Sequence, residues 1–390
     1  MSAFFKSTKT SLELNDCMST VFTYLKYICL LLLLLPIGAV SPLSGKIQGI
    51  SFEEVAFLFT AIFVLSSGEY KPKNLLVTLV MLLTIVTQFV MSHLSSPVNL
   101  SNLKASILLS IFLLAYNNKN LNGGGIITEE IKLLFAVIAI IAFAILNLGY
   151  LQVEGIRQSL YERSGLYRFS MLAFFFWQAY VIAVLFKSRR PRAMVYLLGA
   201  TISIISQDRV FLVFFIVAIL FKIPSRKEFF KSLFIGILLV LAAIYMLPMF
   251  SDELKDRLYG VLDINIIYSE MYGRFIAPLR GVELTAAGVL FGFGADYEFY
   301  IPWFEYRGLN AYHFSVDSFF VTFFIKHGLI LTLFILTLLL RPLLVLGKGF
   351  IAWLVIYLVF HNGLYVPSFL FSMLAINVIF RNDILRSIRT

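Results

Sequence analysis

Residues 313–340 read HFSVDSFFVTFFIKHGLILTLFILTLLL, a stretch that is nearly all apolar. It exceeds the roughly 20 residues that a helix needs to cross a bilayer. Its first half nevertheless carries titratable side chains: His313, Asp317, Lys326 and His327. A charged group in hydrocarbon costs about 2.5–3.5 kcal/mol on insertion scales. We therefore expect residues 313–327 to lie at the membrane interface on the outer side, and residues 328–340 to span the membrane.

The rest of the chain has the same character. Of its 390 residues, 60% are hydrophobic and 14% are charged, whereas soluble domains are about 45–50% apolar and about 25% charged. The composition predicts an all-α polytopic membrane protein with about twelve transmembrane helices. We place these spans near 20–40, 52–66, 74–92, 103–116, 133–150, 169–186, 193–206, 210–221, 232–250, 316–340, 350–361 and 364–380.

The net charge of +10 does not indicate a nucleic-acid-binding protein. Most Lys and Arg residues lie in short loops between apolar runs, which is the topology signal of a membrane protein. The two cysteines, Cys17 and Cys29, are expected at different depths, so we predict no disulfide and no metal site there. We interpret the first apolar run as an uncleaved membrane anchor.

The basic loops also set the orientation of the spans. Residues 193–221 form either one long helix or a hairpin that turns at Gln207, Asp208 and Arg209. The loops on both sides, 187–192 and 222–231, are strongly basic and should both be cytoplasmic. Only a hairpin puts both loops on one side, and it brings Arg209 to the outer surface.

The same rule divides the chain into three parts. Helices 1–9 occupy residues 1–250, a large outer loop occupies 251–315, and helices 10–12 with a cytoplasmic tail occupy 316–390. Both termini are then cytoplasmic. A structureless loop of this length is uncommon, so we expect the outer loop to be partly helical and functional.

Arginines collect on the predicted outer face, against the usual inside bias. A guanidinium group binds phosphate bidentately and remains charged, and neighbouring Tyr and Trp side chains suit sugar rings. The combination points to a lipid-linked diphosphate sugar. The alternative is that they are solvated loop arginines beside interfacial aromatic anchors. The outer arginines include Arg157, Arg163, Arg168, Arg209, Arg257, Arg274, Arg280 and Arg307.

Asp317 is the candidate base among the outer acids. Glycosyl transfer to a hydroxyl needs a base near the attacking oxygen. Asp317 stands where the apolar segment begins, and His313 would share its face if this piece is helical. The alternative, weighed equally, is that Asp317 caps the following helix. His361 and Asn362 are interpreted as a structural turn between the last two spans. No pattern of residues indicates a bound metal or cofactor.

Four local patterns carry a resemblance to a known family. They are RSGLYRFSMLAFFFW (163–177), SQDR (206–209), YGRFIAPLRG with the later LFGFGADYEF (272–299), and Asp317-Ser318 nine residues before Gly328. Together with the architecture, they resemble the O-antigen polymerase and O-antigen ligase group, including Wzy-like polymerases. The ligases have His where this chain has Asp317, and a small residue where it has Leu331, so the polymerases are the nearer match. The long Arg-x10-Gly spacing described for some polymerases is not found.

The resemblance implies a metal-independent glycosyltransferase of the bacterial cytoplasmic (inner) membrane. It would join undecaprenyl-diphosphate-linked oligosaccharides at the outer face, without a cofactor, with a chain-length regulator and a flippase as expected partners. Arg209 and Arg274 would bind the diphosphate, with Arg163 and Arg280 in support. Asp317 would act on the acceptor hydroxyl, with His313 nearby to bind substrate. An O-antigen ligase, or a flippase or transporter, remains the alternative.

Overall fold

The structure is a computed structural model in which part of the chain is described. The described residues are 52–67, 76, 79, 82–87, 90, 100–116, 133–134, 136–138, 140, 161–163, 166–168, 174–188, 191–206, 208–221, 268, 271–280, 282, 284–300, 312–313, 315–362 and 367–380. The predicted spans at 20–40 and 232–250, both cysteines and most of the span at 133–150 lie outside them.

The described part is mostly helical, as expected. Its longer helices are α2 (Phe52–Ser67), α4 (Leu100–Tyr116), α6 (Phe175–Lys187), α7 (Ala193–Ser206), α8 (Arg209–Leu220), α15 (Phe319–Leu340), α16 (Lys348–Phe360) and α17 (Pro367–Leu374). A 3₁₀ turn, η6 (Arg341–Leu346), follows α15, and a π-helical turn, η8 (Ala375–Phe380), follows α17. One helical stretch among the described residues, Phe319–Leu346, is long and apolar enough to cross a membrane.

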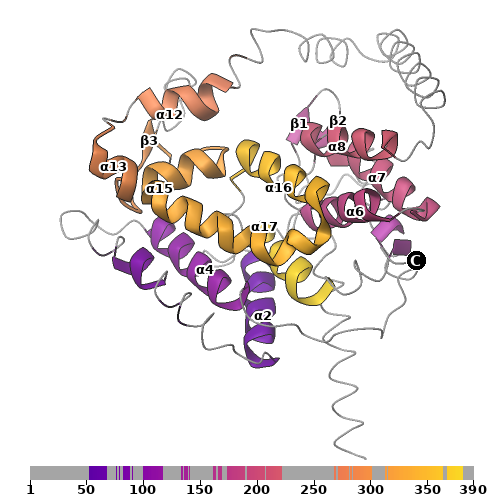
Figure 1. Ribbon diagram of the computed structural model, residues 1–390, viewed down its shortest axis with the longest axis horizontal. Coiled ribbons are helices and arrows are strands. Elements are labelled where there is room, and N and C mark those ends of the chain that lie inside the picture. Colours follow the sequence, from indigo (N-terminus) through magenta and orange to yellow (C-terminus); the bar gives the residue numbers. More distant parts are fainter. Residues whose placement is uncertain are drawn as a thin grey trace, which may run out of the picture.

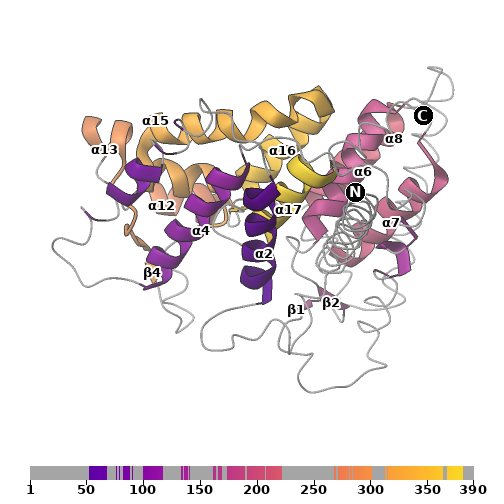
Figure 2. The same ribbon diagram turned by 90° about the horizontal axis from the view of Figure 1, so that it is seen from below.

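Helix α6 is the centre of the bundle. Its residues from Phe175 to Leu185 are all buried, and α7, α8, α16 and α17 pack against it. A helix that is apolar on every side must be surrounded either by other elements or by lipid. Figures 1 and 2 show the first case, with α6, α7 and α8 at one side of the molecule and α16 and α17 next to them.

Aromatic side chains fill the contact between α6, α16 and α17. The ring of Phe175 lies 5.4 Å from Trp353, 4.9 Å from Tyr357 and 4.4 Å from Phe369, measured between centroids. Such pairs contribute about 0.5–1.5 kcal/mol beyond the burial of their area. Phe175 therefore joins three helices at one point, near the start of α6.

The predicted hairpin within residues 193–221 is confirmed. Helix α7 ends at Ser206, Asp208 has extended backbone angles, and α8 begins at Arg209. The two helices pack against each other and against α6. The turn forms here because the Asp208 carboxylate accepts hydrogen bonds from the first free N–H groups of α8, which a continuous helix would not need.

The basic residue at the end of α6 and the basic connection from α15 to α16 meet at the end of the bundle opposite this turn. The side chain of Lys187, the last residue of α6, lies against Gly347, since a Cβ built on that glycine would be 2.8 Å from Lys187 Cε. Gly347 stands between Arg341 and Lys348 in the connection from α15 to α16. The structure thus gathers these cationic side chains at one end.

Helix α15 is broken at Gly328. That residue has φ 77° and ψ 172°, outside the helical region, with helix on both sides. A Cβ at this position would lie 2.3 Å from the backbone oxygen of Leu290. Only glycine tolerates both the angle and the approach. The break coincides with the boundary predicted after His327.

Residues of the predicted outer loop cover the first half of α15. They form η5 (Tyr272–Ile276), α12 (Ala277–Arg280) and α13 (Ala286–Phe291), and the strand β3 (Phe299–Tyr300) pairs antiparallel with β4 (Tyr312–His313). The loop is therefore partly helical, as expected. A second small core joins it to α15, built on the buried side chains of Phe299, Val316, Val321 and Ile325.

Candidate functional site

Asp317 and His313 do not share a helical face, because neither residue lies in a helix and the condition for that expectation is not met. His313 lies in β4, where it pairs with Phe299 of β3. Asp317 is exposed and stands two residues before α15 begins at Phe319. Extended pairing of this segment with β3 prevents the helix from beginning earlier.

The capping role considered for Asp317 is also wrong. Ser318 is the N-cap of α15, and its Oγ accepts a hydrogen bond from the backbone N–H of Val321 at 3.4 Å. Thr322 adds a second link, because its Oγ1 donates to the Val316 carbonyl at 3.1 Å. The helix start is therefore fixed without the Asp317 carboxylate, which faces solvent.

Arg274 and Arg280 lie on η5 and α12, which we call the covering segment. Arg280 is exposed, and its guanidinium carbon lies 5.5 Å from the centre of the Tyr272 ring, with Nη1 donating to the Tyr272 hydroxyl at 3.5 Å. Arg274 is half-buried on η5. Its neighbour Phe275 makes an edge-on ring contact with Phe360, at the end of α16, with 6.3 Å between centroids.

The structure describes Arg209 and Arg163 by their backbones alone. Arg209 is the first residue of α8. Arg163 ends the strand β1 (Tyr161–Arg163), opposite Leu166 in the strand β2 (Leu166–Arg168). The side chains of both arginines lie outside the described part of the structure.

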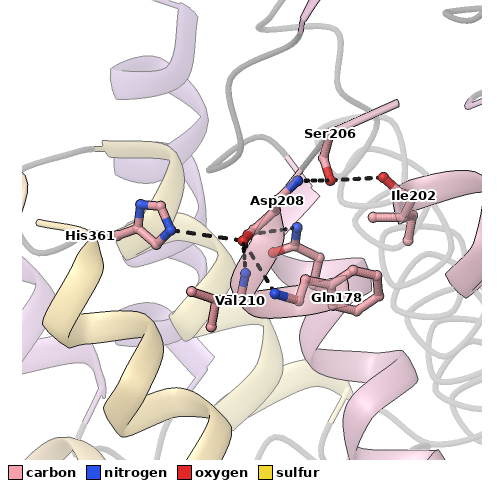
Figure 3. Close-up of polar contacts among 7 residues, drawn as sticks. Gln178, Ile202, Ser206, Asp208, Val210 and His361 are labelled. Atoms are coloured by element: carbon pink, nitrogen blue, oxygen red, sulfur yellow. Dashed lines mark hydrogen bonds and ion pairs between the residues drawn. The ribbon is translucent and has the colours of Figure 1, made fainter. Parts of the chain in front are cut away.

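Asp208 is a functional candidate that the sequence reasoning passed over in favour of Arg209. Its side chain is 1% exposed. Oδ1 accepts from the backbone N–H groups of Val210 (3.0 Å) and Phe211 (3.2 Å), and Oδ2 accepts from Gln178 Nε2 at 3.2 Å. Figure 3 shows the carboxylate at the meeting point of α6, α8 and α16. A buried carboxylate needs such donors to offset its lost hydration.

His361 is a further residue near this carboxylate. Its Nε2 lies 4.0 Å from Asp208 Oδ1, an ion-pair distance that is too long for a hydrogen bond. Its ring packs on Tyr357, with centroids 4.4 Å apart. The sequence interpretation of residues 361–362 as a plain turn therefore missed a contact between helices far apart in the chain.

Gln178, which donates to Asp208, and Asn362, which follows His361 in the chain, have buried side-chain atoms that lack hydrogen bonds in the described structure. Neither Nδ2 nor Oδ1 of Asn362 has a partner in the described structure, and the same holds for Oε1 of Gln178. A buried polar group left without a partner costs about 1–3 kcal/mol. We call Gln178, Asp208 and His361 the Asp208 cluster.

Lys326, near the end of the first half of α15, is also a buried charged residue. Its Nζ donates to the backbone carbonyl of Ala295 at 2.8 Å, and Asp296 and Glu298 act electrostatically on its charge. The backbone bonds Phe293 N–H to Ile325 O (2.8 Å) and Gly294 N–H to Lys326 O (3.0 Å) bring the two segments together. Burial also raises the pKa of the neighbouring Tyr297 phenol. This contact explains the Gly-x-Gly sequence at 292–294, whose first glycine has φ 84°.

No group of three or more His, Cys, Asp or Glu side chains with the spacing of a metal site occurs in the described ranges. Two sets of residues are candidates: Arg274, Arg280 and Arg209, and the Asp208 cluster.

No protein-family model matches the chain, and neither the curated proteins nor the solved structures contain a detectably similar one.

Proposed function

We propose that this chain is a polymerase of bacterial surface polysaccharide, either O-antigen or capsule. It transfers a growing glycan from undecaprenyl diphosphate onto a new lipid-linked repeat unit, at the outer face of the cytoplasmic membrane. In this step the acceptor oxygen bonds to the anomeric carbon, and the bond from that carbon to the diphosphate breaks. A base takes the acceptor proton, and undecaprenyl diphosphate departs.

One chain of contacts carries the proposal. Phe275, next to Arg274, touches Phe360, and the following residue, His361, lies 4.0 Å from Asp208, which precedes Arg209. Two arginines separated widely in sequence therefore belong to one end of the bundle. Guanidinium groups beside a departing diphosphate stabilise the negative charge that develops on it.

The topology proposal rests on the two ends of the same helices. Lys187 and Gly347 meet at one end, whereas Asp208 and His361 meet at the other. The end with more basic residues is assigned to the cytoplasm by the positive-inside rule. The Asp208 end then faces outward, where a repeat unit on its lipid carrier is accessible, and about twelve spans with both termini inside are consistent with this orientation.

The residue roles follow from the resemblance and from exposure. Arg209 and Arg274 bind the diphosphate, and Arg280, held against Tyr272, supports them together with Arg163. Asp317 is the proposed base, because its carboxylate is exposed and open to a substrate, and His313 binds substrate beside it.

Replacement of Arg274 by alanine tests the assigned role. We expect Arg274→Ala to abolish polymer while the protein remains in the membrane. The matched control is Arg341→Ala, at the opposite end of the bundle, which should leave polymer length unchanged. Surface polysaccharide is resolved on a gel, and membrane content is measured by immunoblot. Polymer of normal length from Arg274→Ala would remove that residue from the site.

A gene deletion in the native host distinguishes the polymerase from the ligase and flippase. A polymerase deletion loses the ladder while single units still reach their final attachment. A ligase deletion accumulates long chains on the lipid carrier, and a flippase deletion traps single units on the cytoplasmic side. Gels and extracts of lipid-linked glycans separate these outcomes.

A further inference from the structure

Helix α13 belongs to the predicted outer loop, yet the side chains that it exposes are apolar. Leu284, just before the helix, is 54% exposed, and Leu290 and Phe291, at its end, are 42% and 62% exposed. Ala286 and Ala287 between them are exposed as well. Apolar surface of this kind marks a place where a protein contacts another protein or a membrane.

The sequence around α13 also lacks charge. Residues 284–295 read LTAAGVLFGFGA, with Glu283 directly before them and Asp296 directly after them. An apolar stretch of about 10–14 residues is too short to span a bilayer and suits either a buried core helix or a re-entrant segment that enters the lipid and returns. The exposure of Leu290 and Phe291 excludes the core helix.

The end of α13 lies at the break in α15. A Cβ built on Gly328 would be 2.3 Å from the carbonyl oxygen of Leu290 and 2.5 Å from the backbone nitrogen of Phe291. Immediately after Gly328, Leu329 and Ile330 begin the exposed apolar surface of α15. The exposed apolar residues of the two helices therefore flank one backbone contact. Figures 1 and 2 both show α13 at the edge of the molecule, beside α15 and away from α6.

The irregular backbone at this contact is satisfied by protein. The N–H of Phe293 donates to the carbonyl of Ile325 at 2.8 Å, and the N–H of Gly294 donates to that of Lys326 at 3.0 Å. Both carbonyls stand just before Gly328, where the helical angles of α15 are interrupted. Non-helical backbone is tolerated at membrane depth only where protein or a water-filled cavity supplies its hydrogen bonds. These bonds therefore fit a break that lies among lipids.

We propose that α13 inserts into the outer leaflet of the membrane, with Leu290 and Phe291 in contact with acyl chains at the depth of Gly328. Lipid is the occupant of this surface because the surface adjoins the half of α15 that is apolar enough to cross the membrane. The outer loop then contains a re-entrant segment and does not lie wholly in water. This inference depends on α15 crossing the membrane, and it goes beyond the proposed glycan chemistry.

The test measures which solvent surrounds Phe291 in the full-length chain, reconstituted in phospholipid vesicles. Cys17→Ser and Cys29→Ala remove the native thiols, and Phe291→Cys then carries a nitroxide spin label. Electron paramagnetic resonance compares collisions of the label with oxygen, which concentrates in lipid, and with a neutral nickel chelate, which stays in water. We expect the ratio of oxygen to nickel collisions to be several-fold higher than for a label in water.

Two labelled positions on the same part of the chain calibrate that ratio. Leu329→Cys is the matched lipid control, because Leu329 follows Gly328 and is 41% exposed. Asp317→Cys is the water control, because this exposed acid precedes α15. Phe291→Cys should resemble the first and differ from the second. If the Phe291 variant does not fold, Leu290→Cys replaces it, with the same expected ratio.

Each outcome supports or overturns the insertion of α13. A ratio at Phe291 like that at Asp317 would mean that the helix faces water. Few collisions with either reagent would mean that protein covers the surface, for example a second copy of the chain, and would also overturn the assignment to lipid. A label at Leu329 that collides freely with nickel would overturn the span of α15 together with this inference. None of these outcomes depends on polymer synthesis, so the proposed function is tested separately.

Discussion

The two halves of α15 have similar sequences and different surroundings. Before Gly328, nearly every side chain is buried, including the polar Thr322, Lys326 and His327. After it, large apolar side chains are exposed: Leu329 41%, Ile330 53%, Leu333 52% and Phe334 41%. One half is therefore enclosed by protein, and the other carries an apolar surface suited to lipid.

Enclosure by protein accommodates the titratable side chains in the first half of α15. Lys326 and His327 do not face hydrocarbon, because α13 and the loop from Gly292 to Tyr297 pack against the first half. The Ala295 carbonyl supplies the hydrogen-bond acceptor that lipid lacks. A hydrophobic run thus serves either as protein core or as membrane span, depending on what packs against it.

The largest expected effect tests the difference in burial directly. Phe323 is fully buried, whereas Phe334, on the same helix, is 41% exposed. Phe323→Ala should destabilise the protein by about 3–5 kcal/mol, since a buried cavity remains. Phe334→Ala, the matched control, should cost less than about 1 kcal/mol, because lipid fills the space. Thermal unfolding in detergent measures both, and equal losses would contradict the comparison.

A charge placed in the second half gives the next largest effect. Leu333→Lys puts an ammonium group on the exposed apolar surface, at a cost of about 2.5–3.5 kcal/mol for membrane insertion. We expect a sharp fall in the fraction of protein recovered from the membrane. Leu333→Met is the neutral control. Normal insertion of the lysine variant would mean that this surface faces water.

The smallest effect comes from removing the natural charge in the first half. Lys326→Met leaves the Ala295 carbonyl without its donor and should cost about 1–3 kcal/mol. Because the methionine keeps the approximate length of the side chain, packing against the loop from Gly292 to Tyr297 is retained. Protease sensitivity of residues 284–300 should increase while insertion stays normal. A protein with reduced insertion but an intact loop would show that Lys326 sets topology instead.

The turn before α8 was predictable from sequence, and its chemistry was not. Basic loops on both sides of residues 193–221 required a hairpin, and the structure contains one. The choice between Asp208 and Arg209 depends on which side chain points into the bundle. Charge patterns along the chain carry no such information, because Gln178 and His361 reach Asp208 only through helix packing.

The start of α15 shows a similar limit. The spacing of His313 and Asp317 suits a helix, but pairing with β3 keeps His313 in a strand and leaves the cap to Ser318. Long-range pairing overrode the local pattern. The glycines at 292 and 328 are visible in the sequence, but only the tertiary structure places Lys326 O against Gly292 and Leu290 O against Gly328.

The sequence by itself determined that this chain is helical and apolar, where most described helices lie, and which loops are basic. Those properties follow from hydrophobicity and charge, which act locally and can be summed along the chain. The tertiary structure alone decided which half of α15 is enclosed, that Asp208 is buried, and that Asn362 lacks a partner while Asn377 has one. Each of these depends on contacts between segments far apart in sequence, whose geometry no local pattern specifies.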